Sequence, residues 1–255
     1  EKNQLPIVFG NAIAKGGSHL LAQYLTGLSK VTPLVMTSYQ PIRLLAPEGR
    51  ERKDERVVKD LARLRHGDMA WGYVPARVPF IDLLTRADWI TYFIYRDPRD
   101  KIISHILYAL EIHKGHAMRE FYRAKPDMEA MIDATIRGVP GLVPSIREAY
   151  ASYRGWLEKP SVLKVRYEDL ILERNTTLRW MVQPFSDGNW FVSDLEYLEI
   201  LETINQAMAP EHSLTYRKGQ AGAWKDYFTE KNITTFKDLT GDLLLDLGYE
   251  SSMDW

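Results

Sequence analysis

The segment from Trp89 to Arg96, WITYFIYR, constrains the fold of this chain more than any other stretch does. It is aromatic and β-branched, as strands are, and it is apolar on both of the faces that a strand would present. A strand buried on both faces is typical of the centre of a parallel sheet, where helices cover each side. The segment therefore predicts an α/β protein built on such a sheet.

Segments of strand and helix character alternate along the rest of the chain. We expect further strands at Leu5–Asn11, Val31–Thr37, Asp68–Val74 and Ser161–Tyr167. We expect helices at Gly16–Leu28, Glu48–Leu64, Phe80–Thr85, Asp100–His113, Met128–Leu157 (with a break at Gly138–Gly141), Asp169–Val182, Ser193–Met208 and Thr234–Leu247, and loops at Gln183–Asn189 and Ala209–Ala223. This alternation favours a mostly parallel central sheet flanked by helices, in a single α/β domain over residues 1–255.

Basic and aromatic side chains follow three of the predicted strands. Lys15, Arg96 and Tyr167 each stand at or just beyond the end of a strand segment. The carboxyl ends of parallel strands meet at one edge of the sheet, and ligands of α/β proteins bind there. We therefore expect these three residues to meet on the same edge.

The composition excludes several classes of function. The chain has 255 residues and a formal net charge of −1, which argues against a nucleic-acid-binding protein, since such a protein needs a basic face. It contains no cysteine, which excludes disulfides and thiolate metal sites. It has neither a run of about 18 apolar residues that could span a bilayer nor the N-terminal pattern of a secretory signal. We therefore expect a soluble cytoplasmic protein with no nucleic-acid or membrane partner.

The segment AKGGSHLL places a lysine and two glycines where a strand gives way to a helix. The backbone amides of Gly16, Gly17, Ser18 and His19 would open that helix, and the glycines put no side chain in front of them. A helix N-terminus favours negative charge, and the ammonium of Lys15 adds a full positive charge beside it. The pattern predicts a P-loop-like anion-binding loop, with an exposed lysine in a glycine turn as the ordinary alternative. It is not a Walker A loop, because the lysine precedes the glycines.

The segment YRDPRDKIISHILYA combines a guanidinium with a hydroxyl. Ser104 lies eight residues after Arg96, about two helical turns away. Side chains so placed can share one phosphate, which arginine binds with its two-pronged donor group. The alternative is a weak surface ion pair of Arg96 or Arg99 with Asp100.

The segment YRKGQAGAWKDYFT is the most specific of the three. Arg217, Lys218 and Gly219 would wrap a phosphate with two side chains and a backbone amide. A basic turn in solvent is the alternative, but it does not explain why glycines recur before an aromatic pair. Trp224 and Phe228 are that pair, and they are able to anchor the loop.

In these segments the chain resembles the sulfotransferases that use 3′-phosphoadenosine 5′-phosphosulfate (PAPS) as donor. The run from Lys15 to His19 is similar to the family's 5′-phosphosulfate loop, usually written PKSGTT. Arg96 and Ser104 match the family's 3′-phosphate pair at the same spacing. The resemblance covers nearly all of the chain.

Two more motifs carry the resemblance. The segment from Arg217 to Thr229 follows the family's RKGxxGxWKxxFT signature. The segment LKVRYEDL is similar to the strand-end motif whose tyrosine lies near the adenine, and that tyrosine is Tyr167 here. All of these motifs occur in the family's order and with its spacing.

The resemblance implies a donor, a site and a mechanism. It implies PAPS as donor, the bisphosphate PAP as product, and no metal. Sulfuryl transfer would be an in-line displacement in which the protein places the reactants and stabilises charge, with Lys15 acting on the leaving oxygen. The donor would be held by the residues of the motifs, namely Lys15, Gly16, Gly17, Ser18, His19, Leu20 (where the family usually has a tryptophan), Arg96, Ser104, Tyr167, Arg217, Lys218 and Gly219.

The general base for the acceptor departs from the family's pattern. The family often supplies a histidine from a KTHLP-like or GHxP-like segment, and the matching segment here is AWGYVPA. Tyr73 takes the place of the histidine, and no lysine stands two residues before it. A tyrosine has an ordinary pKa of about 10 and is a poor base near neutrality unless that pKa is lowered. His113 is the second candidate for this catalytic role, and His19 and His116 are further ones.

Two other functions fit parts of the pattern. A P-loop kinase would use ATP and magnesium, but the order of lysine and glycines counts against it. A module that binds the bisphosphate without catalysis would explain the missing histidine.

Under the main interpretation the acceptor is a small molecule or a carrier-tethered group. The family's dimer motif KxxxTVxxxE keeps only Lys225 and Thr229 here, which favours a monomer, with a dimer made elsewhere as the alternative.

Overall fold

The computed structural model describes residues 4–37, 41–44, 51–192, 195–209 and 221–255. The chain divides into two compact units. The first, which we call the sheet unit, comprises residues 1–95 and 152–213. The second, the helical unit, comprises residues 96–151 and 214–255.

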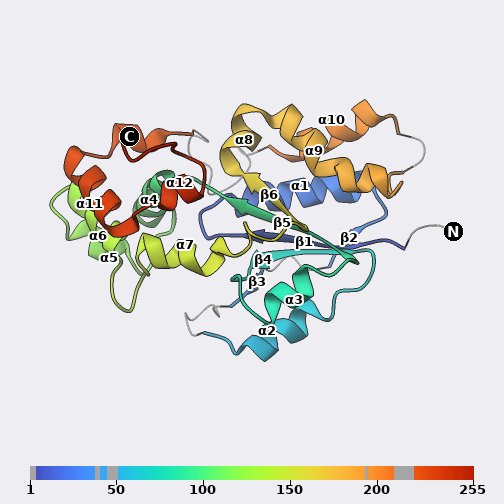
Figure 1. Cartoon of the computed structure of the whole chain (residues 1–255), viewed down its shortest axis with the longest axis horizontal. Coiled ribbons are helices and arrows are strands. Elements are labelled where there is room, and N and C mark those ends of the chain that lie inside the picture. Colours follow the sequence, from blue (N-terminus) through green and yellow to red (C-terminus); the bar gives the residue numbers. More distant parts are fainter. Residues whose placement is uncertain (1–3, 38–40, 45–50, 193–194, 210–220) are drawn as a thin grey trace. The chain divides into compact units, whose positions relative to one another are not determined.

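The sheet unit is built on a parallel sheet. Its described strands are β1 (Ile7–Ala12), β2 (Val35–Met36), β3 (Ile42–Arg43), β4 (Asp68–Tyr73), β5 (Trp89–Tyr95) and β6 (Val162–Arg166). The order across the sheet is β2-β4-β1-β5-β6, with β3 also paired to β4, and all of these pairings are parallel (Figure 1). β5 lies between β1 and β6, where its two apolar faces are buried. The predicted mostly parallel central sheet is confirmed.

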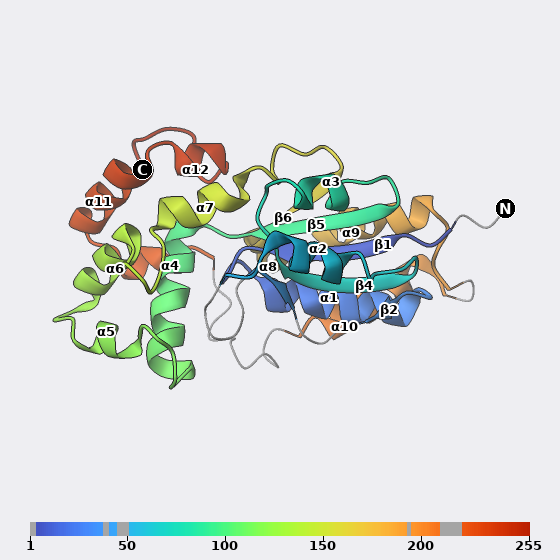
Figure 2. The ribbon, with the colours of Figure 1, turned by 90° about the horizontal axis from the view of Figure 1, so that it is seen from below.

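Helices cover both faces of this sheet, as Figures 1 and 2 show. One face carries α1 (Ser18–Val31), α8 (Tyr167–Leu172), α9 (Arg174–Asp187) and α10 (Tyr197–Ala207), and the other carries α2 (Asp54–Leu61) and α3 (Phe80–Leu84). The main hydrophobic core fills the first of these interfaces, where the leucines of α1 pack with side chains of the strands, α9 and α10. Two buried hydroxyls within it, those of Tyr24 and Tyr92, both donate to the carbonyl of Met181. The core therefore leaves these polar groups satisfied.

The helical unit contains helices and short turns. They are α4 (Pro98–Leu107), a π-helical turn η1 (Tyr108–Ile112), α5 (Arg119–Arg123), α6 (Met128–Arg137), the start of α7 (Ile146–Arg154), a 3₁₀ turn η3 (Ala223–Asp226), α11 (Glu230–Thr240) and α12 (Leu243–Asp246). α6 packs against α4 and α11. The Glu129 carboxylate joins the starts of α6 and α11 by accepting hydrogen bonds from Thr229 (2.8 Å) and Lys231 (2.9 Å). Among the described helices of the chain, none combines the length and apolarity that crossing a membrane requires.

The helix expected at Thr234–Leu247 has different bounds for local reasons. It begins at Glu230, because the hydroxyl of Thr229 caps it by accepting a hydrogen bond from the N–H of Asn232. It ends at Thr240, because Gly241 follows with φ 55° and ψ −129°, a backbone conformation that a helix does not contain. The last turn of the predicted helix is the separate helix α12.

The prediction after β6 is wrong in two respects. Tyr167 does not end the strand but begins α8, and the expected single helix is two helices that meet at Glu173. The loop predicted at Gln183–Asn189 is helical as far as Asp187 and contains Pro184. Packing outweighs the lost N–H of the proline here, since the neighbouring Phe185 is completely buried.

The edge of the sheet also differs from expectation. The strand expected at Val31–Thr37 is reduced to Val35–Met36, because α1 continues to Val31. Helix α2 is shorter than the expected Glu48–Leu64 and begins at Asp54. The expected helix Ser193–Met208 is described from Tyr197. β3 and α5 were not predicted, because two and five residues are too few to show a strand or helix period.

Candidate active site

The lysine–glycine segment turns the chain from β1 into α1. Lys15 and Gly17 both have left-handed backbone, with φ 63° and 107°, and Gly17 is the residue that precedes α1. A methyl group on Gly17 would lie 2.8 Å from the Tyr167 ring. One on Gly16 would lie 2.4 Å from the side chain of Ile13. The segment thus needs both glycines, and its bare backbone lies directly against Tyr167.

The start of α1 has a positive electrostatic character. The first N–H groups of a helix have no partner inside it, and the first turn of α1 has no acidic residue. The pKa of His19 is lowered by burial and, secondly, by the positive charge of Lys15. His19 is therefore neutral at neutral pH. The expected set of open amides is corrected at Gly16, whose N–H donates to the carbonyl of Ile13 (2.8 Å).

Tyr73, at the end of β4, reaches the same segment. Its hydroxyl and the hydroxyl of Ser18 form a hydrogen bond of 2.7 Å. The chain just after Tyr73 is held by Asn11, whose side-chain amide donates to the carbonyl of Val74 (2.8 Å) and accepts from its N–H (2.9 Å). This pairing joins the carboxyl ends of β1 and β4 and fixes the phenol beside the start of α1.

The structure thus brings part of the predicted site together within the sheet unit. The Lys15 segment follows β1, Tyr73 ends β4 and Tyr167 follows β6. The contact of Gly17 with Tyr167 confirms that the segment and this tyrosine adjoin at the carboxyl edge of the sheet. Leu20, which was expected near the adenine, is buried with Tyr167 in the main core and is 4% exposed.

Arg43 is a neighbour of this group that sequence reasoning missed. It lies on β3 in register with Tyr73, and its guanidinium carbon is 5.7 Å from the centroid of the Tyr73 ring. The ring of Tyr73 also makes an edge contact with Trp71 (5.8 Å between centroids). The only sequence signal for Arg43 is its charge, because a two-residue strand has no detectable pattern.

In the helical unit, Arg96 stands two residues before α4 and Ser104 lies within that helix. Arg96 follows β5 directly, and Asp100 and Ser104 lie four residues apart, on one side of α4. The Arg96 guanidinium is 3.7 Å from the Asp100 carboxylate. The alternative of a surface pair is wrong, because the side chain of Asp100 is 0% exposed and that of Arg96 is 12% exposed.

Asp100 also holds the chain beyond the predicted basic loop. Its carboxylate accepts hydrogen bonds from the N–H groups of Gly222 and Trp224, each 2.8 Å long. Burial raises the pKa of Asp100, while Arg96 and these two N–H groups act to lower it. Sequence reasoning assigned Asp100 to a surface pair, since nothing in the local pattern reveals a hydrogen bond to residues more than 120 positions away.

The residues Arg217, Lys218 and Gly219 lie outside the described part of the chain. Trp224 and Phe228, the pair predicted to anchor this loop, meet edge to face at 5.7 Å between ring centroids, and their anchoring of the loop stays a prediction. The Arg99 guanidinium lies 4.0 Å from the Trp224 ring, and Trp255 packs against the same tryptophan at 5.8 Å. The chain that follows the predicted loop is therefore firmly packed.

His113 lies in the helical unit, just after η1, and is exposed. Its ring contacts those of Tyr108 and His116, at 5.7 and 5.6 Å between centroids. The N–H of Met118 donates to Nδ1 of His116 (3.1 Å), so a neutral His116 carries its proton on Nε2. In the described part of the chain, no three histidine or acidic side chains are grouped so as to hold a metal ion.

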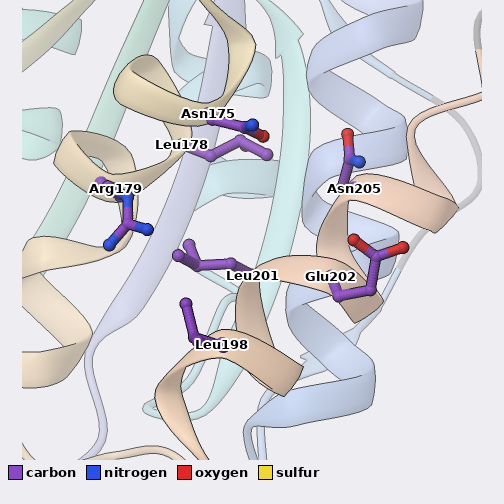
Figure 3. A pocket seen from close by; sticks show the side chains of 7 residues that line it. All are labelled: Asn175, Leu178, Arg179, Leu198, Leu201, Glu202 and Asn205. Atoms are coloured by element: carbon purple, nitrogen blue, oxygen red, sulfur yellow. The ribbon is translucent and has the colours of Figure 1, made fainter.

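A pocket of about 300 Å³ lies between α9 and α10 (Figure 3). Three leucines and four polar side chains line it, namely Leu178, Leu198, Leu201, Asn175, Arg179, Glu202 and Asn205. No residue of the predicted donor site is among them. This pocket is therefore not the candidate active site.

Comparison with known proteins places this arrangement in a family. The model of the sulfotransferase domain matches residues 91–248, more than half of the chain. The match includes Arg96, Ser104, Tyr167 and the segment from Arg217 to Gly219, and the Lys15 segment precedes it.

Named plant sulfotransferases are among the relatives in sequence. Cytosolic sulfotransferase 11 of Arabidopsis thaliana is 26% identical over 153 residues, which is 52% of this chain and 44% of that protein. Flavonol 3-sulfotransferase of Flaveria bidentis is 22% identical over 178 residues, which is 60% of this chain and 54% of that protein. The chain spans about half the length of the curated relatives it matches.

Solved structures share the fold. The mouse sulfotransferase SULT7A1 complexed with PAP superposes with a TM-score of 0.65 at 18% identity, covering 96% of this chain and 87% of that one. A retinol dehydratase in complex with androsterone and inactive cofactor PAP gives 0.59 at 16% identity, covering 93% and 80%. Since the family model matches more than half of the sequence, this chain belongs to the sulfotransferase domain family.

Proposed function

We propose that this chain is a sulfotransferase that takes a sulfuryl group from PAPS, transfers it to a hydroxyl or amine of a small or carrier-bound acceptor, and releases PAP. Membership of the sulfotransferase domain family supports the reaction class. Two solved structures with this fold are named as complexes with PAP, which supports the donor. The observation that carries the proposal is the Lys15 segment, whose bare glycine backbone opens α1 beside a lysine and against Tyr167.

The residues of this segment fit the phosphosulfate end of such a donor. The open N–H groups at the start of α1 favour an anion, and Lys15 adds charge without a competing acidic residue in the first turn. Gly17 leaves the backbone uncovered next to the ring of Tyr167, which offers a flat surface to an adenine. We assign Gly16, Gly17, Ser18, His19, Leu20 and Tyr167 to this part of the donor site.

We assign the 3′-phosphate to the start of α4 and the basic loop. Arg96 precedes α4 and Ser104 lies within it, and the 12% exposed side chain of Arg96 keeps a surface for an anion. Arg217, Lys218 and Gly219 complete this part by the family signature. Asp100 holds Arg96 on one side and the N–H groups of residues 222 and 224 on the other, so it orients both pieces.

The chemistry of the transfer follows from these assignments. Bound PAPS supplies the sulfuryl group. Lys15 and the first N–H groups of α1 stabilise the negative charge that develops on the oxygen leaving the sulfur. Tyr73 is the first candidate for the base, because its hydroxyl is held by Ser18 within the same segment. His113, exposed and in contact with two other rings, is the second.

The experiment measures donor binding and transfer separately. The protein is titrated with PAP in a calorimeter and is incubated with ³⁵S-labelled PAPS and a panel of alcohols, phenols, amines and carrier proteins. We expect PAP binding that weakens about 10- to 100-fold in Arg96→Ala, and labelled products whose rate of formation Lys15→Ala lowers about 100-fold. Absence of PAP binding would refute the proposal.

Two outcomes would favour the other functions. Tight PAP binding without transfer to any acceptor would indicate a non-catalytic binding module, which the replacement of the family's histidine by Tyr73 favours. Transfer that requires magnesium and ATP would indicate a kinase. Turnover of PAPS that is unchanged by a chelator would exclude the kinase, since the proposed reaction uses no metal.

The remaining assignments concern organisation. We propose that residues 1–255 act as one sulfotransferase domain, which the 96% coverage of this chain by a solved sulfotransferase supports. We propose a monomer, because the family's dimer motif is incomplete here. We also propose a cytoplasmic location, which the name of the relative called cytosolic sulfotransferase 11 supports. Light scattering and fractionation of tagged protein test these two assignments.

A further inference from the structure

Tyr73 has an environment that a structural tyrosine at a strand end does not need. Its hydroxyl bonds to Ser18, its ring edge meets Trp71, and the Arg43 guanidinium faces it from β3. The side chain of Tyr73 is only partly buried. These features point to a phenol that is held in place and kept near a positive charge.

The pairing of β3 with β4 places Arg43 beside Tyr73, so their contact does not depend on the side chains alone. The register of β3 on β4 puts Arg43 directly opposite Tyr73, on the same face of the sheet. Gly72 allows this close pairing, since a methyl group there would lie 2.1 Å from the carbonyl oxygen of Ile42. Arg52 fixes the other side of β3, because its guanidinium donates to the carbonyl of Arg43 (3.0 Å).

Among the described residues, no ion pair neutralises the charge of Arg43. The neighbouring Arg52 forms an ion pair with Asp60, whereas Arg43 pairs with no carboxylate among the described residues. Three of the described groups around Tyr73 carry no opposing charge at neutral pH. They are the Ser18 hydroxyl of α1, His19 beyond Trp71, and Tyr153 of α7, whose own pKa is raised by burial and by Tyr73.

We propose that Arg43 is a positioning residue for Tyr73, and that its guanidinium stabilises the phenolate through which Tyr73 takes the proton of the acceptor. This inference rests on the proposed function. In the step, the acceptor oxygen gives its proton to the Tyr73 oxygen and bonds to sulfur. The bond from sulfur to the phosphate oxygen of the donor breaks, and its electron pair stays on PAP. Tyr73 then returns the proton to water.

The size of the effect follows from distance and exposure. Arg43 is exposed, so solvent screens it, and a charge at about 6 Å then changes an ionisation constant about threefold to tenfold. A phenol of ordinary pKa near 10 is about 0.3% ionised at pH 7.5. Arg43 would raise this fraction to about 1–3%, and the rate at neutral pH would rise by a smaller factor, because a more acidic phenol gives a weaker base.

The experiment reads the ionisation of Tyr73 directly. Protein labelled with ¹³C at the tyrosine Cζ is titrated by NMR, and Tyr73→Phe identifies the signal. Arg43→Ala, Arg43→Lys and Arg43→Gln are compared with Arg179→Ala, a matched control in which an exposed arginine faces another tyrosine ring, that of Tyr197, at 5.8 Å. PAP affinity and circular dichroism check that each variant is folded.

We expect Arg43→Ala and Arg43→Gln to lower the ionisation constant of Tyr73 about threefold to tenfold. Arg43→Lys should restore part of it, and the control should leave it unchanged. Turnover near pH 7.5 should fall by a smaller factor, because the remaining phenolate is a stronger base. The pH profile of turnover should move to higher pH, and PAP affinity should stay constant. An unchanged Tyr73 titration in Arg43→Gln would overturn the inference. A protein that transfers no sulfuryl group would refute the proposed function, whereas the titration would still test Arg43.

Discussion

Lys101 gives a quantitative test of how burial acts on this fold. It lies on α4, with its ammonium 5.7 Å from the ring centroid of Tyr150, and among the described residues no carboxylate pairs with it. Burial lowers its pKa from 10.5 to about 8. Folding therefore opposes the charged form of this side chain.

The magnitude follows from the two pKa values. One pH unit corresponds to about 1.4 kcal/mol, so the difference between 10.5 and about 8 amounts to about 3 kcal/mol at most. The side chain as a whole is partly exposed, which reduces the realised cost to about 1–3 kcal/mol. We expect Lys101→Met to raise the free energy of unfolding by about this amount at pH 7.

The sign of the pH dependence is fixed by the direction of the pKa change. Below pH 8 both the folded and the unfolded chain carry the proton, and the full penalty is present. Between about pH 8 and 10.5 the unfolded chain binds more protons, so stability rises with pH in the natural protein and not in Lys101→Met.

The assay is urea unfolding of both proteins from pH 7 to pH 10, followed by circular dichroism. The stability gained by Lys101→Met should shrink as the pH rises above 8. Lys225→Met is a matched control on the surface of the same unit, and it should show no such trend. A gain that is independent of pH, or a loss of stability at pH 7, would refute the reasoning.

Substitutions at three further positions test the site. Lys15→Ala should lower turnover about 100-fold and change PAP affinity much less. Turnover is measured by steady-state kinetics and PAP affinity by calorimetry. Equal losses in both would show that Lys15 acts only in binding. Gly17→Ala should destabilise the protein by about 2 kcal/mol and weaken PAP binding, because the backbone φ of 107° and the Tyr167 ring exclude a methyl group. An unchanged melting temperature would contradict this. Asp100→Ala should cost about 3 kcal/mol in urea unfolding, because two N–H groups and Arg96 lose their partner. Asp100→Asn, which keeps one acceptor oxygen, should cost less, and an equal cost in both would show that the charge alone matters.

The parts of the fold that the sequence predicts are those with a long, regular pattern. β5 could be placed at the centre of the sheet because both of its faces are apolar, and α1 could be placed by its spaced leucines. Ends of elements were less predictable. Helix α11 begins at a cap and stops at Gly241, and α9 runs through Pro184 because packing holds its last turn.

At the site, the residue types predicted those features that depend only on residues close together in the sequence. Gly16 and Gly17 form the expected turn, because a methyl group at either position would clash with a neighbouring side chain and Gly17 has left-handed backbone. Two other contacts between distant segments could not be predicted. Arg43 meets Tyr73 through a two-residue strand, and Asp100 bonds to residues beyond position 220, and neither pairing leaves a trace in the local pattern.

In the proposed mechanism, the acid–base chemistry of Tyr73 depends on Gly72, although a glycine has no functional group. Its backbone has no need of glycine's freedom, and the requirement is only that nothing projects toward the carbonyl of Ile42. Gly72→Ala would therefore widen the gap between β3 and β4 and carry a charge away from a phenol while leaving both side chains intact. Under the roles proposed here, a single methyl group at this position would displace the working pH range of the protein.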